Sequence, residues 1–182
     1  MWHYCFSPLA TFGPLKRLNI TIESFRNGRK VIADQRHEGG LIVADRNAVS
    51  LVTPAGAVLL LAGVPGESGN NDQDGQRPEA EAEFGEITDL FQISLNVIVV
   101  VDKKHNCVRQ IDRDSRHVTA FAGNCYDMND QQFKSRSYVS AKQARLYQPL
   151  IGALQSETAL YYTLTQDEFT LVKHDLSSGM HS

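Results

Sequence analysis

The sequence lacks several features that mark particular classes of protein. Its 182 residues include only three cysteines, too few for a disulfide-built fold, and no Cys-x-x-Cys pair suited to structural zinc. Its purely apolar runs are short, whereas a transmembrane helix needs about 20 residues. The net charge of −3 gives no basic excess for nucleic acid or an acidic membrane surface. With 42% hydrophobic residues, the chain can still build the core of one globular domain.

Two segments repeat one pattern. Leu41–Gly63 and Val97–Gly123 each begin with an apolar run that ends in an aspartate, Asp45 or Asp102. Each continues through a polar turn, an alternating strand, a second turn and a last strand that ends in Ala-Gly. No segment has the sustained i, i+3, i+4 apolar spacing of a helix. The pattern therefore predicts an all-β repeat fold.

The apolar runs LIVA and VIVVV have no polar alternate positions, so both faces of these strands should be covered. Four-stranded sheets stacked face to face around an axis, as in a β-propeller, meet this demand. We expect one domain spanning 1–182, with repeat units at about 10–63, 80–123 and 141–176 and long loops at 64–83 and 124–148. The third unit is expected to stop before its last strand. Four-stranded units are expected at about 40–93 and 97–154. Their innermost strands should lie near Ile87–Ile93 and Leu150–Leu154, and the inner strand of the first repeat unit should lie upstream of Gly40.

The motif Val43-Ala44-Asp45-Arg46-Asn47, its counterpart at 100–106 and the closing segment Val118–Gly123 resemble the NHL repeat. The resemblance covers about residues 10–176 and implies a partial β-propeller of about three four-stranded antiparallel blades. The third unit departs from the motif, because Thr165-Gln166-Asp167 stands at the aspartate position. The family usually closes a ring of about six blades. Because an open array leaves blade faces uncovered, we expect self-association or missing blades to close the ring.

Cys107 and Cys125 flank the open end of one predicted hairpin, so a disulfide between them is geometrically plausible; two buried free thiols are the alternative. A disulfide implies an oxidising compartment, and Asn19-Ile20-Thr21 is a glycosylation sequon that agrees. We therefore expect an extracellular or secretory protein, with a cytoplasmic one as the alternative. The first residues do not have the pattern of a signal peptide.

A possible calcium loop begins at Asn70. Asn70, Asp72, Asp74 and Glu81 occupy positions 1, 3, 5 and 12 of such a loop. Arg77 stands where an apolar residue should pin the loop, and no helices flank it, so a solvated turn is the favoured interpretation. The six histidines lack metal-binding spacing and are interpreted as exposed turn residues. The sequence thus predicts no catalytic residue, no cofactor, and no metal apart from this calcium candidate.

Turns between second and third strands should emerge on one face of the propeller together with the links between blades. Long loops of this kind are often functional, and aromatic residues with arginine are typical of protein interfaces; tolerated insertions are the alternative. The candidates on this face are Arg46, Asn47, Lys103, His105, Tyr126, Phe133, Arg136 and Tyr138.

The expected function is that of a non-enzymatic scaffold which binds a protein or a glycan, with no nucleic-acid partner and no membrane span. The alternative is a fragment of a six-bladed propeller enzyme, either amidating-lyase-like or calcium-dependent-hydrolase-like.

Overall fold

The computed structural model describes residues 27–69, 76–78, 81–123, 125, 139–140, 146–154, 160–165, 171–175 and 180–181. Within these ranges the strands form three antiparallel sheets and there is no helix. The first sheet has the order β1 (Lys30–Ala33), β2 (Leu41–Ala44), β3 (Ala48–Val52) and β4 (Val58–Gly63). The second contains β6 (Ile87–Gln92), β7 (Val97–Asp102), β8 (Cys107–Asp112) and β9 (His117–Ala122), with β5 (Gln76–Pro78) beside β9. The third contains β11 (Pro149–Leu154), β12 (Leu160–Thr165), β13 (Leu171–Asp175) and β14 (Met180–His181), with β10 (Val139–Ser140) beside β14.

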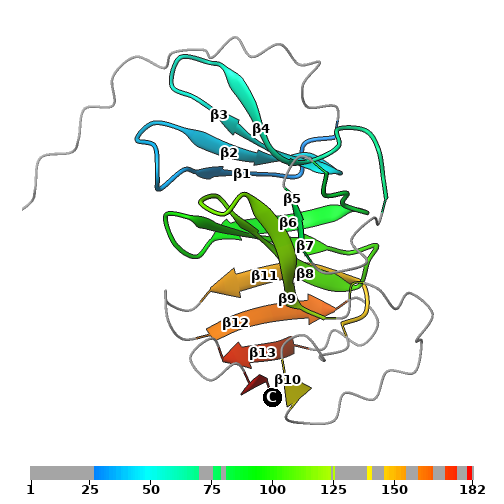
Figure 1. Cartoon of the computed structure of the whole chain (residues 1–182). Helices are drawn as coiled ribbons and strands as arrows, with labels where there is room; N and C mark the ends of the chain where they lie inside the picture. Colours follow the sequence, from blue (N-terminus) through cyan, green and yellow to red (C-terminus); the bar gives the residue numbers. More distant parts are fainter. Residues whose placement is uncertain are drawn as a thin grey trace, which may run out of the picture.

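The three sheets are stacked, with the second between the first and the third (Figure 1). Strands β1, β6 and β11 each form one edge of their sheet, and β6 contacts both β1 and β11. We call this the inner edge. The predicted innermost strands at 87–93 and 150–154 correspond to β6 and β11, and β1 lies upstream of Gly40 as expected.

Three details of the expected strand grouping are wrong. The units at 40–93 and 97–154 are not sheets, because β6 pairs with β7 rather than with β4. The third unit does have a last strand, the short β14, which pairs with β13. Both long loops contain a short strand, β5 in one and β10 in the other.

The strands predicted to be covered on both faces are buried. In β7, every residue from Ile98 to Asp102 is buried, and in β2 every residue from Ile42 to Ala44. One apolar cluster packs the first sheet against the second; it contains Ile42, Ala44, Val49, Ala62, Ala82, Phe84, Ile87, Leu90, Ile98, Val100, Ile111 and Val118. The opposite face of β7 and β8 forms a second cluster, which contains Val99, Val101, Val108, Ala122 and Leu146. Continuous apolar strands are thus explained by burial on both sides.

In the first and second sheets, the repeated aspartates tie the inner strand to the second strand. Asp102 accepts hydrogen bonds from the backbone N–H groups of Gly85 and Glu86, both at 3.0 Å, just before β6. Asp45 accepts one at 2.9 Å from the N–H of Asn27, just before β1. A buried carboxylate is well matched to these otherwise unpaired donors.

The repeated asparagines tie each sheet to the next one. The Asn47 side chain donates to the carbonyl groups of Phe84 and Gly85 at 3.0 and 2.8 Å, and the Asn106 side chain accepts from the N–H of Gln148 at 2.9 Å. Both contacts reach the segment that leads into the following sheet. The repeated motif therefore specifies two kinds of contact. Its aspartate joins the inner strand to the second strand within a sheet, and its asparagine docks that sheet on the next one.

The glycines of the two Ala-Gly endings, Gly63 and Gly123, are required by the backbone conformation there. Gly63 and Gly123 have φ of +93° and +85°, a region that disfavours side chains. A Cβ at either position would also meet the backbone carbonyl of the repeated asparagine, Asn47 or Asn106. The Ala-Gly ending seen in the sequence follows from this close approach.

Candidate functional site

The turns at 45–47 and 103–106 lie on one face with the segments that lead into β6 and β11, and we call this the turn face. The N–H of Ile87 donates to the carbonyl of Arg46 at 2.7 Å, and the N–H of Lys103 donates to the carbonyl of Glu86 at 2.8 Å. The two turns therefore flank one short segment, 86–87. The turn face is a continuous surface built from two sheets.

Exposed cations gather on the turn face. Arg29 pairs with Glu86 at 3.1 Å, and Arg46 lies 4.0 Å from the same carboxylate. The Lys104 ammonium donates to the Ser68 hydroxyl at 2.8 Å. The Arg29 and Arg46 side chains are 38% and 50% exposed, so solvent screens their ion pairs and these pairs contribute little to stability.

Two residues expected on the binding face are buried instead. Asn47 is 5% exposed because its amide bonds the lead-in to β6, and His105 is 2% exposed because its ring packs beside Asp102. The expectation that the histidines are exposed is therefore wrong for His105. Arg46 is exposed and Lys103 partly so, as expected.

A buried charged network lies beneath the turn face. His105 Nδ1 is 2.8 Å from Asp102 Oδ2, and Arg109 Nη1 is 3.9 Å from the same oxygen. The Arg109 guanidinium also donates to the carbonyl of Glu83 at 2.7 Å and lies over the Phe84 ring, 4.7 Å from its centroid. These contacts join the turn at 103–106 to the segment that leads into β6.

Asp89 joins all three sheets at the inner edge. Its carboxylate receives the Lys30 ammonium from β1 at 2.7 Å and the backbone N–H of Gly152 from β11 at 3.0 Å. Neighbouring Thr88 donates its hydroxyl to the carbonyl of Pro149 at 3.3 Å. The register shifts between Ile87 and Asp89, and such a bulge re-aims side chains.

The inner-edge residues occupy equivalent positions in the three sheets. Lys30, Asp89 and Ile151 each pair with the residue just before the repeated aspartate position, which holds Asp45, Asp102 and Thr165 respectively. One position thus carries a cation, an anion and an isoleucine that is 53% exposed.

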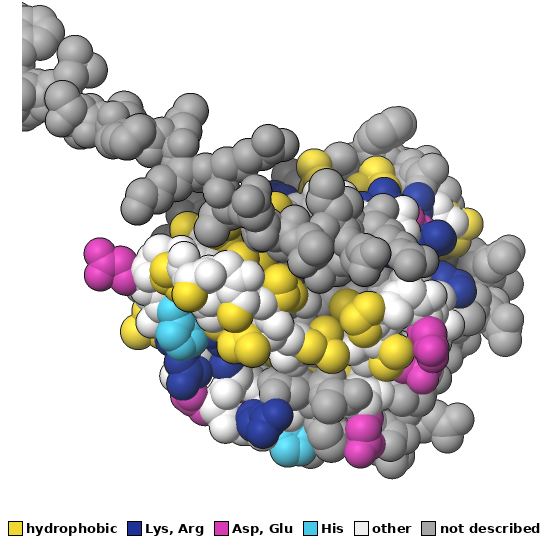
Figure 2. All heavy atoms as spheres, turned by 90° about the horizontal axis from the view of Figure 1, so that it is seen from above, with side chains coloured by type: hydrophobic (Ala, Val, Ile, Leu, Met, Phe, Trp, Pro, Cys, Tyr) yellow, Lys and Arg dark blue, Asp and Glu magenta, His cyan; other side chains and the backbone are white. Residues whose placement is uncertain are grey.

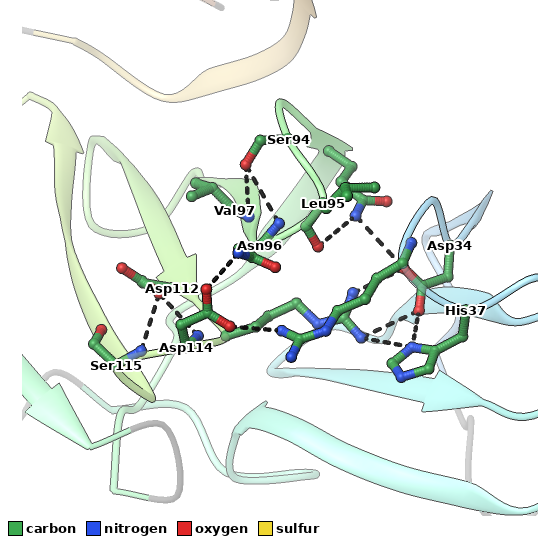
Figure 3. Close-up of polar contacts among 12 residues, drawn as sticks. Asp34, His37, Ser94, Leu95, Asn96, Val97, Asp112, Asp114 and Ser115 are labelled. Atoms are coloured by element: carbon green, nitrogen blue, oxygen red, sulfur yellow. Dashed lines mark hydrogen bonds and ion pairs between the residues drawn. The ribbon is translucent and has the colours of Figure 1, made fainter.

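The opposite face, formed by the other hairpin turns, carries an ion network between the first and second sheets (Figure 3). Arg113 from the β8–β9 turn donates two hydrogen bonds to Asp34, at 2.8 and 3.1 Å. His37 Nδ1 lies 2.7 Å from Asp34, and the N–H of Arg36 donates to Asp34 at 3.0 Å. Gln92 of β6 accepts from the N–H of Gln35 at 2.9 Å, which adds a contact between the same two sheets.

The carboxylate of Asp34 is held in its charged form. Burial raises the pKa of Asp34, but hydrogen bonds from Arg113, His37 and the Arg36 backbone outweigh it and hold the pKa well below its ordinary value of 3.8. In the β8–β9 turn, which also carries Arg113, backbone hydrogen bonds from Ser115 and Asp114 lower the pKa of Asp112. Sequence reasoning missed Asp34 and Asp89, because nothing local in the chain marks their distant partners.

Cys107 and Cys125 lie at disulfide distance, as predicted, with their Cα atoms 5.1 Å apart. Both are buried. Among the described residues, no group of three His, Cys, Asp or Glu side chains is arranged to hold a metal ion, and no helix is long and apolar enough to cross a membrane.

Most of the remaining predicted site residues lie outside the described part of the chain. Glu81 is described and is exposed. The others are Asn19, Asn70, Asp72, Asp74, Tyr126, Phe133, Arg136 and Tyr138.

Comparisons with known proteins add a likeness of fold. No family model matches the chain, and no curated protein matches it, so the NHL resemblance rests on its motifs. A structural genomics protein of unknown function from Bacteroides thetaiotaomicron VPI-5482 is similar in structure, with a TM-score of 0.58 and 16% sequence identity. The match covers 80% of this chain and 32% of that one, so this chain spans about a third of its length. The comparison supports an all-β fold that is shared with a longer protein.

Proposed function

We propose that this chain is an arc of an NHL-type β-propeller that acts as a non-enzymatic scaffold and binds a protein or a glycan through its turn face. The observation that carries the proposal is the use of the repeated motif: Asp45 and Asp102 tie inner strands, and Asn47 and Asn106 dock successive sheets. A motif that specifies both contacts can be repeated around an axis. This supports blades in series rather than three unrelated sheets.

The contacts made by the buried aspartates support a scaffold rather than an enzyme. Asp34, Asp89 and Asp102 are each buried, and each binds backbone N–H groups or cationic side chains of the protein itself. A catalytic acid or base needs a face open to substrate. The exposed cations Arg46 and Lys104 lie instead on a surface that a partner can reach. The Cys107–Cys125 pair supports an extracellular or secretory location.

The turn face can be tested by reversing its charge. Arg46→Glu, Lys103→Glu and Lys104→Glu are combined in one variant, and Glu38→Lys, an exposed residue of the opposite face, is the control. Both proteins and the wild type are applied to a glycan array and to an array of secreted-protein ectodomains. We expect binding that the triple variant loses and the control retains.

Two results would overturn the proposal. Binding that survives in the triple variant would exclude the turn face. Stoichiometric zinc or calcium in the purified protein would favour the alternative, a fragment of a six-bladed propeller enzyme.

A further inference from the structure

Each repeated asparagine binds the segment that leads into the following sheet, and the first sheet's own lead-in has no such partner among the described residues. Asn47 binds the lead-in to β6, and Asn106 binds the lead-in to β11. The first sheet is one end of the stack, and hydrophobic side chains are visible at the surface of this end of the molecule (Figure 2). The lead-in to β1 contains Asn27-Gly28, the only Asn-Gly pair in the sequence.

The corresponding segment of the second sheet is packed against its neighbours. There the residue that donates its N–H to the repeated aspartate is Gly85, which is buried, and a Cβ on it would meet the His105 ring at 2.9 Å. In the first sheet the corresponding donor is Asn27, which is exposed together with Gly28. A Cβ on Gly28 would have no atom within 4 Å. The same segment is therefore enclosed in the second sheet and open to solvent in the first.

Backbone hydrogen bonds hold both ends of this open segment. The N–H of Asn27 donates to Asp45 at 2.9 Å, and the N–H of Arg29 donates to the carbonyl of Ala44 at 2.8 Å. Neither the N–H of Gly28 nor the side-chain amide of Asn27 has a hydrogen bond to the described residues. The Gly28 nitrogen is thus unprotected, and it follows an exposed asparagine whose side chain is not held elsewhere.

We propose that Asn27-Gly28 is a site of self-modification whose product loosens the start of β1. The Gly28 nitrogen attacks Cγ of Asn27, and the side-chain NH2 group leaves as ammonia with the proton of the attacking N–H, so that a cyclic imide forms. Solvent water then opens the imide at either of its carbonyl groups, which gives aspartate or isoaspartate at residue 27. Glycine favours ring closure, because it has no Cβ to hinder the attack and its backbone is permissive.

Isoaspartate changes the backbone between the two hydrogen bonds. The main chain then runs through Cγ of residue 27, and it gains one carbon between N–H groups that are fixed on Asp45 and on the Ala44 carbonyl. The free α-carboxylate also lies two bonds from the nitrogen that donates to Asp45, so two like charges come close together. Both changes weaken the bond to Asp45. The inference holds whether or not the turn face binds a partner.

Peptide mass spectrometry of the full-length chain tests the site. The folded wild type and the wild type in urea are incubated in mildly alkaline buffer, and isoaspartate is measured by enzymatic methylation. We expect residue 27 to convert at similar rates in both, because the fold does not restrain it. Gly28→Ala should slow the conversion several-fold, since the added methyl crowds the attacking nitrogen, and Asn27→Gln should nearly abolish it, since its longer side chain must close a larger ring.

Asn96 is a control within the same molecule. Its side chain donates to Asp114, and the following N–H, that of Val97, donates to the Ser94 hydroxyl at 3.2 Å. Asn96 should stay unconverted in the folded chain. Conversion of Asn96 as fast as that of residue 27 would contradict the role given to the open segment.

Hydrogen exchange measures the consequence of the modification. The isoaspartate form is separated from the unmodified chain by ion-exchange chromatography, and it should exchange faster at 30–33 and unchanged at 97–102. Conversion of residue 27 that is many-fold slower in the folded chain than in urea would overturn the site. Unchanged exchange at 30–33 would overturn the release from Asp45. Both readouts use the wild-type chain, so neither depends on a variant that folds.

Discussion

Asp34→Asn should be among the most destabilising conservative substitutions in the chain. The Asp34 side chain is fully buried, and its partner Arg113 is only 5% exposed. The variant keeps the shape of the side chain but leaves the Arg113 guanidinium buried without its counter-charge. Removal of one member of a buried ion pair typically costs about 3–5 kcal/mol, because the remaining charge stays desolvated. We expect a loss of this size in the free energy of unfolding, measured by urea denaturation at pH 7.

A matched control lies in the same network. Asp114 is 55% exposed and pairs with Arg36 at 3.0 Å. Asp114→Asn should cost about 1 kcal/mol or less, because solvent screens an exposed pair. Adding Arg113→Met to Asp34→Asn should restore part of the loss, since no buried charge then remains unpaired.

The pH dependence gives a second, independent measurement. Because the pKa of Asp34 is lowered by folding, its stabilisation is fully present above the ordinary pKa of 3.8 and declines as the pH falls toward the native pKa. The difference between wild type and Asp34→Asn should therefore be constant from neutral pH down to about pH 5 and should narrow below about pH 4. A loss no larger than that of Asp114→Asn, or a difference that does not change with acid, would refute the reasoning.

Three further substitutions test the other contacts, each by denaturant unfolding. Asp89→Ala should cost about 2–3 kcal/mol, because it removes charge-assisted bonds that join three sheets; a loss below that of an exposed pair would contradict this role. Gly63→Ala should cost more than about 2 kcal/mol, because its Cβ meets the Asn47 carbonyl, whereas Gly56→Ala, with open space around it, should cost about 1 kcal/mol. Cys107→Ser should cost about 2–3 kcal/mol and not unfold the protein, because the sheet keeps its core; unchanged stability under non-reducing conditions would show that no disulfide forms.

Local patterns in the sequence determined the class of structure. The continuous apolar runs at 41–44 and 97–101 required cover on both faces, and the structure buries them between stacked sheets. The repeated Asp, Asn and Gly positions were visible as a pattern, because each makes the same contact in the first and second sheets. The cysteine pair was visible too, since both residues belong to one hairpin region.

Tertiary structure alone decided which polar residues face solvent. Asn47 and His105 looked like exposed turn residues. The Asn47 side chain instead bonds carbonyl groups of the lead-in to β6, and the His105 ring lies against Gly85 of that same segment. Asp34 meets Arg113 from a different sheet, and Asp89 meets groups from two others. A sequence pattern records periodicity along one strand, whereas these contacts depend on how separate sheets are placed in space. The sequence therefore determined the main strands and the cover of their faces, and the tertiary structure decided which charges are buried and which partners they meet.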